Sequence, residues 1–134
     1  GGYSVMSPVL VVEDNEINAE IIMTLLESRG IPNELAVDGI DSIDKCVSKP
    51  KDYYSLILMD IHMPRMNGYD AAKKIKSELA MTAPIIGQTA THTTDASINE
   101  HKAYISGYLY KPFKPDQLYE IVARYLESAN KNAV

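Results

Sequence analysis

The amino-acid sequence predicts an α/β fold of the doubly wound (βα)5 type, a three-layer sandwich with a five-stranded parallel sheet between two layers of helices. Short apolar runs alternate five times with helical patterns, and this alternation implies right-handed crossovers between parallel strands. The first run, residues 8–12, is apolar throughout, as strands buried on both faces are. Charged and hydroxyl residues follow the runs, at the sheet edge where such folds gather ligands and reacting groups.

The first two strand–helix units are read directly from the apolar spacing. After the strand over 8–12 comes a helix with apolar residues at spacings of three to five, which are Ile17, Ile21, Ile22, Leu25 and Leu26. Gly30 ends this helix. A weaker strand covers 34–37, and Asp38-Gly39 opens a second helix with three residues expected to face inward: Ile40, Ile43 and Val47.

The other three units follow the same order. Their strands are expected over 55–59, 84–88 and 107–110. The helix over 66–79 presents one apolar side, made of Tyr69, Ala72 and Ile75. A polar helix is expected over 94–103. The last helix has Pro115 in its first turn, which suits a helix start, and one apolar face made of Leu118, Ile121, Val122, Tyr125 and Leu126.

Composition indicates one globular domain. The chain has 134 residues, of which 46% are hydrophobic and 23% charged, as in ordinary globular domains. The net charge of −5 argues against nucleic-acid binding, which needs clustered Lys and Arg. The single Cys46 excludes an internal disulfide, and no apolar run reaches the roughly 18 residues of a membrane span. We expect a cytoplasmic domain over 7–128, preceded by an added or linker segment (1–6) and followed by a tail (129–134).

Reactive side chains collect at the predicted strand ends. Glu13 and Asp14 follow the first strand, Asp60 the third, Thr89 the fourth and Lys111 the fifth. Crowded carboxylates are unfavourable unless a cation lies among them, and Mg²⁺ prefers such oxygen ligands. A carboxylate can attack a phosphoryl group, whose spread negative charge needs the metal, an ammonium and a hydroxyl donor. The set therefore predicts phosphoryl transfer to a carboxylate.

Four stretches in this order, VLVVEDNEIN, LILMDIHMPRMNGYDA, IIGQTA and GYLYKPF, resemble the response-regulator receiver domain of two-component phosphorelays. These stretches are most similar to those of receivers attached to hybrid histidine kinases. The resemblance covers residues 7–128 and implies a flavodoxin-like sheet with strand order 2-1-3-4-5. It also implies that Asp60 is the phosphoacceptor and that Glu13 and Asp14 hold Mg²⁺, with Mn²⁺ as a possible substitute.

The resemblance assigns further roles around the site. His62 would offer its backbone carbonyl to the metal, Thr89 would be the switch hydroxyl, and Lys111 would pair with phosphoryl oxygens. Tyr108 would be the switch aromatic, turning from exposed to buried. Ala90 would be the small residue that gives access, the Lys111–Pro112 peptide would be cis, and His62 and Thr91 would flank the path of the water that removes the phosphoryl group.

The resemblance also implies partners and an output. The phosphoryl donor would be a histidine kinase or a histidine phosphotransfer domain, and the domain would be a monomer or weak dimer without separate enzymatic activity. Phosphorylation would change the face formed by the fourth helix, fifth strand and fifth helix. Tyr104 stands where the family usually has a small residue, most often glycine. We therefore expect the polar helix before it to open locally more readily than the other helices.

Two other aspartate or phosphate chemistries fit less well. A dehalogenase-like phosphatase needs a second Asp two residues after the nucleophile, where this chain has His62. A flavodoxin-type binding module needs a hydroxyl- and glycine-rich loop after the first strand, whereas residues 13–16 (EDNE) would repel phosphate without a metal. The three histidines, His62, His92 and His101, lack the spacing of a transition-metal site.

Overall fold

Five strands form one parallel sheet in the order β2-β1-β3-β4-β5, which confirms the predicted fold. The computed structural model describes the backbone of residues 7–132 and the side chains of residues 7–126, so the predicted segment 1–6 lies outside the described residues. The strands are β1 (Val9–Val12), β2 (Asn33–Ala36), β3 (Leu56–Asp60), β4 (Ile85–Thr89) and β5 (Gly107–Tyr110).

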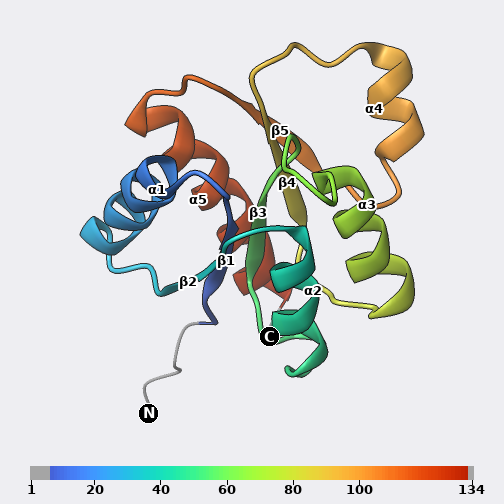
Figure 1. Ribbon diagram of the computed structural model, residues 1–134. Coiled ribbons are helices and arrows are strands. Elements are labelled where there is room, and N and C mark those ends of the chain that lie inside the picture. Colours follow the sequence, from blue (N-terminus) through green and yellow to red (C-terminus); the bar gives the residue numbers. More distant parts are fainter. Residues whose placement is uncertain (1–6, 133–134) are drawn as a thin grey trace.

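Helices cover both faces of this sheet. They are α1 (Glu16–Ser28), α2 (Gly39–Val47), α3 (Gly68–Lys73), α4 (Asp95–His101) and α5 (Pro115–Asn132), with a π-helical turn, η1 (Lys74–Glu78), after α3. α1 and α5 lie on one side of the sheet, and α2, α3 and α4 on the other (Figure 1). α5 continues to Asn132, so helical backbone runs beyond the domain end that we placed at residue 128.

The core is divided by the sheet into two apolar layers. Successive residues of a strand face opposite sides, so in β1 Val9 and Val11 face α1 and α5, while Leu10 and Val12 face α2 and α3. β1 and the first four residues of β3 have no exposed surface. Complete burial on both faces explains why these two strands read as unbroken apolar runs.

The predicted inner face of α2 is right for Ile43, which is half-buried and packs against the core, and wrong for its other two residues. Ile40 and Val47 are 41% and 63% exposed, and the buried residues are Gly39, Ser42 and Cys46. The helix lies close to the loop after β3, because a Cβ at Gly39 would come within 3.1–3.3 Å of Met66. The Ser42 hydroxyl donates to the Gly39 carbonyl at 2.6 Å, which satisfies it without a distant partner. Small residues therefore make this contact, and a count of large apolar residues missed it.

α1 presents two of its apolar residues to solvent. Ile17 is 71% exposed and Ile21 is 49% exposed, whereas Ala19, Ile22 and Leu26 are buried against the sheet. The helix begins at an N-cap, where the Asn15 side chain accepts a hydrogen bond from the Asn18 N–H at 3.0 Å. The apolar spacing thus predicted the helix correctly. It did not distinguish the residues that face the core from Ile17 and Ile21, which form an exposed apolar strip.

α4 is shorter than the predicted 94–103 and has no buried residue. It ends without the left-handed residue that a glycine would supply, since among the described non-glycine residues positive φ occurs at Arg65 and Ala80 and not at Tyr104. Instead, the N–H groups of Tyr104 and Ile105 both donate to the His101 carbonyl, at 3.1 and 2.8 Å. Within residues 7–132, no helix combines the length and apolar character that crossing a membrane requires.

Candidate functional site

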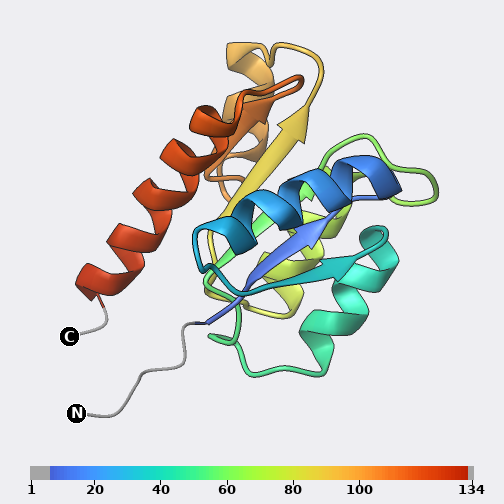
Figure 2. The same ribbon diagram turned by 90° about the vertical axis from the view of Figure 1, so that its left-hand side faces the viewer.

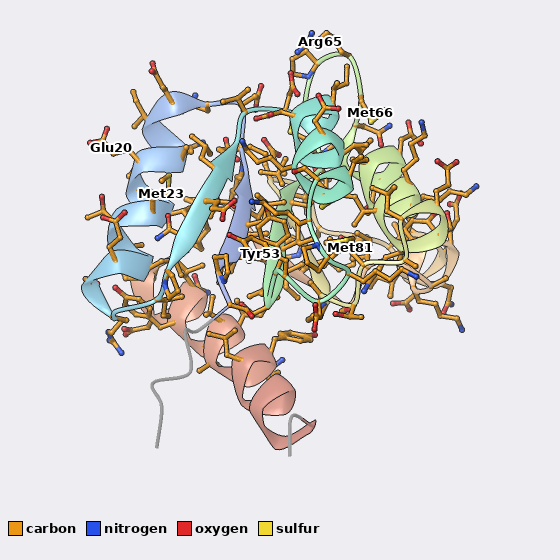
Figure 3. The ribbon with its side chains drawn as sticks, turned by 90° about the horizontal axis from the view of Figure 1, so that it is seen from below. Glu20, Met23, Tyr53, Arg65, Met66 and Met81 are labelled. Carbon is orange, nitrogen blue, oxygen red and sulfur yellow. The ribbon has the colours of Figure 1, made fainter. Side chains whose placement is uncertain are left out.

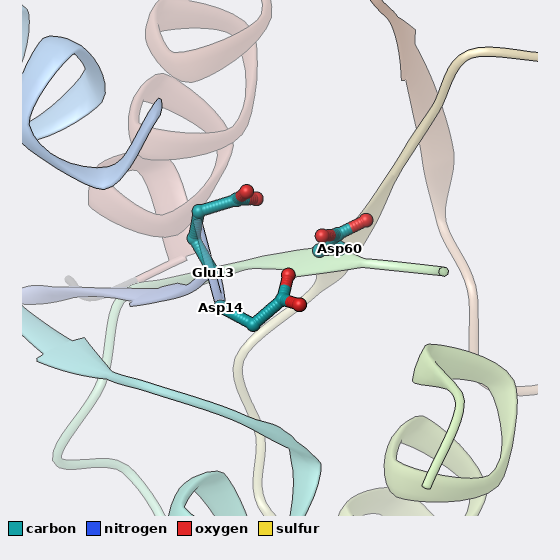
Figure 4. Close-up of side chains that lie close together, drawn as sticks. All are labelled: Glu13, Asp14 and Asp60. Atoms are coloured by element: carbon teal, nitrogen blue, oxygen red, sulfur yellow. The ribbon is translucent and has the colours of Figure 1, made fainter. Parts of the chain in front are cut away.

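The carboxyl ends of β1, β3 and β5 bring two acids and a lysine into contact. Lys111 Nζ lies 3.2 Å from Glu13 Oε2 and 3.5 Å from Asp60 Oδ1. Asp14 completes the group, because one carboxylate oxygen from each of Glu13, Asp14 and Asp60 lies within 4.8 Å of the others. Figure 4 shows the three carboxylates grouped at the ends of β1 and β3. The structure thus assembles four of the residues that the sequence analysis singled out.

Burial makes this acid cluster electrostatically unusual. Glu13 and Asp60 are 2% and 4% exposed, while Asp14 is open to solvent. The pKa of Asp60 is raised to about 7, first by burial and then by the negative charge of Glu13, against the opposing effect of the Lys111 ammonium. A cation among these oxygens would favour the charged form of all three acids. The donor set, carboxylates only, fits a hard cation such as Mg²⁺.

The loop after β3 holds Asp60 in place through a close backbone contact. The Gly68 N–H donates to the Ile61 carbonyl at 2.8 Å. A Cβ at Gly68 would overlap the Asp60 carbonyl oxygen and lie 2.8 Å from Ile61 Cα, so only glycine fits. The His62 N–H donates to Asp60 Oδ1 at 3.2 Å. The loop therefore turns back directly against the strand end and orients the carboxylate.

The same loop is tied to α2 by an ion pair that the sequence analysis did not foresee. The Arg65 guanidinium donates to the Asp38 carboxylate, and Arg65 itself has a left-handed backbone with φ 68°. Asp38 also caps α2, accepting from the Asp41 N–H at 2.8 Å. This backbone bond, followed by Arg65, keeps the pKa of Asp38 below its ordinary value despite burial. Figure 3 shows Arg65 and Met66 beside the first turn of α2.

Thr89 lies at the end of β4 and is 4% exposed. Its hydroxyl oxygen accepts from the Thr91 N–H at 3.2 Å and lies 3.3 Å from His62 Nε2. Ala90, the next residue, is exposed. The predicted switch hydroxyl and the two residues predicted to tune dephosphorylation therefore form one contact group.

A cavity of about 370 Å³ adjoins the lysine on the α1 side. It is lined by Asn18, Ile21, Ile22, Ala90, Lys111, Pro112 and Phe113. The Lys111–Pro112 peptide is cis, as expected. The cavity walls are mainly aliphatic and aromatic, so the charged site borders an apolar hollow. No sequence pattern indicates this cavity, because its walls come from three separate segments.

Tyr108 is half-buried, which differs from the exposed starting position that we expected. Its ring lies against the backbone of β4, since a Cβ at Gly87 would come within 3.2 Å of the ring. Its hydroxyl lies 3.4 Å from the Tyr69 hydroxyl on α3. Burial, and then the Tyr69 hydroxyl, raise the pKa of Tyr108.

The two remaining histidines lie away from the acid cluster. The His92 ring lies 4.7 Å from the Tyr110 ring, and the His101 ring is stacked on Tyr69. In the part of the chain that the structure describes, the only group of three or more potential metal ligands is Glu13, Asp14 and Asp60. His92 and His101 each contact a tyrosine ring.

The family model of the response regulator receiver domain matches residues 9–123 of the chain. The chain belongs to this family. As a receiver domain it is a module of two-component signal transduction, and the acid cluster lies at the strand edge where the resemblance placed it.

Its curated relatives include receivers of hybrid histidine kinases. The chain is 37% identical over 121 residues to the osmosensing histidine protein kinase SLN1 of Saccharomyces cerevisiae, covering 87% of the chain and 10% of that kinase. It is 32% identical over 128 residues to the peroxide stress-activated histidine kinase mak1 of Schizosaccharomyces pombe, covering 92% and 8%. The chain therefore spans about a tenth of the length of such relatives.

Solved structures show the same fold. The receiver domain of the sensor histidine kinase PA1611 from Pseudomonas aeruginosa superposes with a TM-score of 0.78 at 32% identity, over 92% of this chain and 99% of that one. That structure has a magnesium ion coordinated in its active site cleft. The chemotaxis protein CheY4 of Vibrio cholerae gives a TM-score of 0.80 at 28% identity, over 91% and 100%.

Proposed function

We propose that this receiver domain accepts a phosphoryl group on Asp60 from a phosphohistidine, in a reaction that requires Mg²⁺. The observation that carries the proposal is the buried Asp60 carboxylate with Lys111 3.5 Å away and two further acids beside it. A structural aspartate would not need two more carboxylates and a lysine at the same strand edge. The donor would be a histidine kinase or a histidine phosphotransfer domain.

Glu13, Asp14 and Asp60, with the backbone carbonyl of His62, are the residues that would hold Mg²⁺, or Mn²⁺ in its place. The all-oxygen donor set and the raised pKa of Asp60 support this assignment. When bound, the ion would offset the charge that develops on the transferring oxygens.

The residues of the chain have distinct tasks in the transfer. An Asp60 oxygen forms a bond to phosphorus while the bond from phosphorus to the donor imidazole breaks, and the imidazole leaves with the electron pair. Lys111 Nζ, already beside Asp60, pairs with the phosphoryl oxygens. The Thr89 hydroxyl donates to one of them. His62 and Thr91, which both contact the Thr89 hydroxyl, would set how fast water removes the group.

The partner would contact the exposed apolar strip of α1. Ile21 lines the cavity that adjoins Lys111, and Ile17 and Ile21 together line a second hollow on α1. A donor histidine that reached Asp60 through the cavity beside Lys111 would pass close to Ile21. Apolar surface beside a reactive group is typical of protein contact sites.

The relatives support a proposal about the protein to which this domain belongs. We propose that the domain is part of a hybrid sensor histidine kinase or, failing that, a response regulator, and works in the cytoplasm. It would act as a monomer or weak dimer, without binding nucleic acid and without catalysing a reaction on another molecule. Phosphorylation would act through Thr89 and Tyr108 on the face formed by α4, β5 and α5.

Intact-mass measurement tests the central step. The protein is incubated with acetyl phosphate and Mg²⁺, and one phosphoryl group per molecule is expected in wild type. Asp60→Asn and wild type with chelator should show none, while Asp44→Asn, which removes an exposed acid, should label normally. Equal labelling of wild type and Asp60→Asn would reject Asp60 as the acceptor.

A further inference from the structure

Aromatic rings from three elements meet beside α4. The His101 ring, in the last turn of α4, is stacked on the Tyr69 ring of α3 with centroids 3.6 Å apart and planes 12° apart. The Tyr104 ring meets His101 edge to face at 5.8 Å. On its other side, the Tyr69 hydroxyl lies 3.4 Å from the hydroxyl of Tyr108 in β5. Tyr69 thus contacts both α4 and the aromatic residue of β5.

The stack matters because α4 has few other attachments. None of its residues is buried, and Ile98, its large apolar residue, is 38% exposed. Ring pairs of this kind contribute about 2- to 12-fold to an equilibrium beyond the area that they bury. His101 Nδ1 lies 2.9 Å from the Ser97 carbonyl, which fixes the ring relative to its own helix. The Tyr69–His101 contact therefore holds the helix as well as the side chain.

Tyr108 is in turn positioned by the strand that carries Thr89. Its ring lies over Gly87, two residues before Thr89 in β4. A Cβ at Gly87 would also come 3.0 Å from the Ile61 side chain, which follows Asp60. Any displacement of Tyr108 from this position changes the distance between its hydroxyl and that of Tyr69.

We infer that Tyr69 is the positioning residue through which a movement of Tyr108 reaches α4. This inference extends the proposed switch, in which phosphorylation moves Thr89 and Tyr108, by naming the residue that transmits it to the helix. Tyr69 keeps its ring on His101 only while its hydroxyl has the Tyr108 hydroxyl as a neighbour. When Tyr108 moves, the stack loosens and α4 opens more often.

A double-mutant cycle on the metal-free, unphosphorylated protein tests this coupling. The measurement is amide hydrogen exchange of residues 95–104 in wild type, Tyr108→Leu, Tyr69→Leu and the double variant. Tyr108→Leu should accelerate exchange about 2- to 12-fold in the wild-type background. In the Tyr69→Leu background, where exchange is already fast, it should add less than a twofold change, because the transmitting residue is gone.

A control separates this route from a second aromatic contact of the same region. The Tyr110 hydroxyl donates to Thr93 Oγ1 at 3.2 Å and so ties the loop before α4 to β5. Tyr110→Phe should therefore change exchange by the same factor in both backgrounds. If the leucine variants do not fold, Tyr69→Phe and Tyr108→Phe repeat the cycle on the hydroxyl pair alone.

Equal effects of the Tyr108 substitution in the two backgrounds, or no effect in wild type, would overturn the inference. The proposed function is judged separately, by whether Mg²⁺ and beryllofluoride change exchange of residues 95–104 in wild type. The double-mutant cycle uses neither Mg²⁺ nor beryllofluoride. Its result is therefore independent of the measurement that tests the proposed function.

Discussion

Replacing Asp60 by Asn should stabilise the metal-free protein at neutral pH. The carboxylate is 4% exposed and lies beside Glu13, so ionising it in the folded protein costs free energy that ionising it in the unfolded chain does not. Asparagine has nearly the same shape and carries no charge. It leaves Lys111 its ion pair with Glu13, at 3.2 Å.

The size of the effect follows from the raised pKa. Its value rises from 3.8 to about 7, so between these pH values the folded protein keeps a proton that the unfolded chain has lost, and the free energy of unfolding falls as pH rises. At about 1.36 kcal/mol per pKa unit, the penalty is roughly 1 kcal/mol at pH 4.5 and roughly 4 kcal/mol at pH 7.5. Asp60→Asn should gain these amounts.

Urea unfolding at the two pH values, with chelator present, measures the gain. Asp44→Asn makes the same change of charge at an exposed position and should show no pH-dependent gain. Added Mg²⁺ should stabilise wild type and narrow the difference from Asp60→Asn. An Asp60→Asn protein that is equally stabilised at both pH values, or less stable than wild type at pH 7.5, would refute the electrostatic reasoning.

Four other outcomes are expected. Gly68→Ala should destabilise the fold by about 1–3 kcal/mol in urea unfolding, because its Cβ overlaps the Asp60 carbonyl; unchanged stability would mean that the loop moves aside freely. Asp14→Ala should weaken Mg²⁺ binding about tenfold or more in calorimetric titration and stabilise the metal-free fold, and unchanged affinity would place the metal elsewhere. Replacing His62 and Thr91 together by Ala should change the decay rate of the aspartyl phosphate but not its formation, so an unaltered decay rate argues against their role. Amides of α4 should exchange fastest among the helices of the metal-free protein, and Mg²⁺ with beryllofluoride should change their protection in wild type much more than in Thr89→Ala; strong protection without the mimic would contradict this.

The sequence was informative wherever a residue's role depends on its position in a strand. The runs at β1 and β3 are buried on both faces, so their composition alone identified them. Parallel strands end at one edge, so the residues after each strand could be grouped before any contact was known. Glu13, Asp14, Asp60 and Lys111 do meet there.

Contacts made by small or exposed residues could not be predicted in the same way. α2 packs through Gly39, Ser42 and Cys46, and hydrophobicity alone ranks Ile40 and Val47 above them. The ion pair between Arg65 and Asp38 joins two loops 27 residues apart, and neither residue signals the other. Ring stacking on α4 likewise depends on side-chain directions that spacing does not determine.

The two ends of the described chain lie on the same side of the domain, at the amino-terminal ends of the strands and away from Asp60. β1 enters the sheet at Val9, and α5 runs back against the strand direction before it ends at Asn132 (Figure 2). Polypeptide fused before or after this unit would extend from the side away from Asp60. It would not cross the path of an incoming phosphoryl donor. The unit can therefore be appended to a larger protein or inserted into it, and anchoring it to a sensor chip or fluorophore through either end should leave Asp60 accessible.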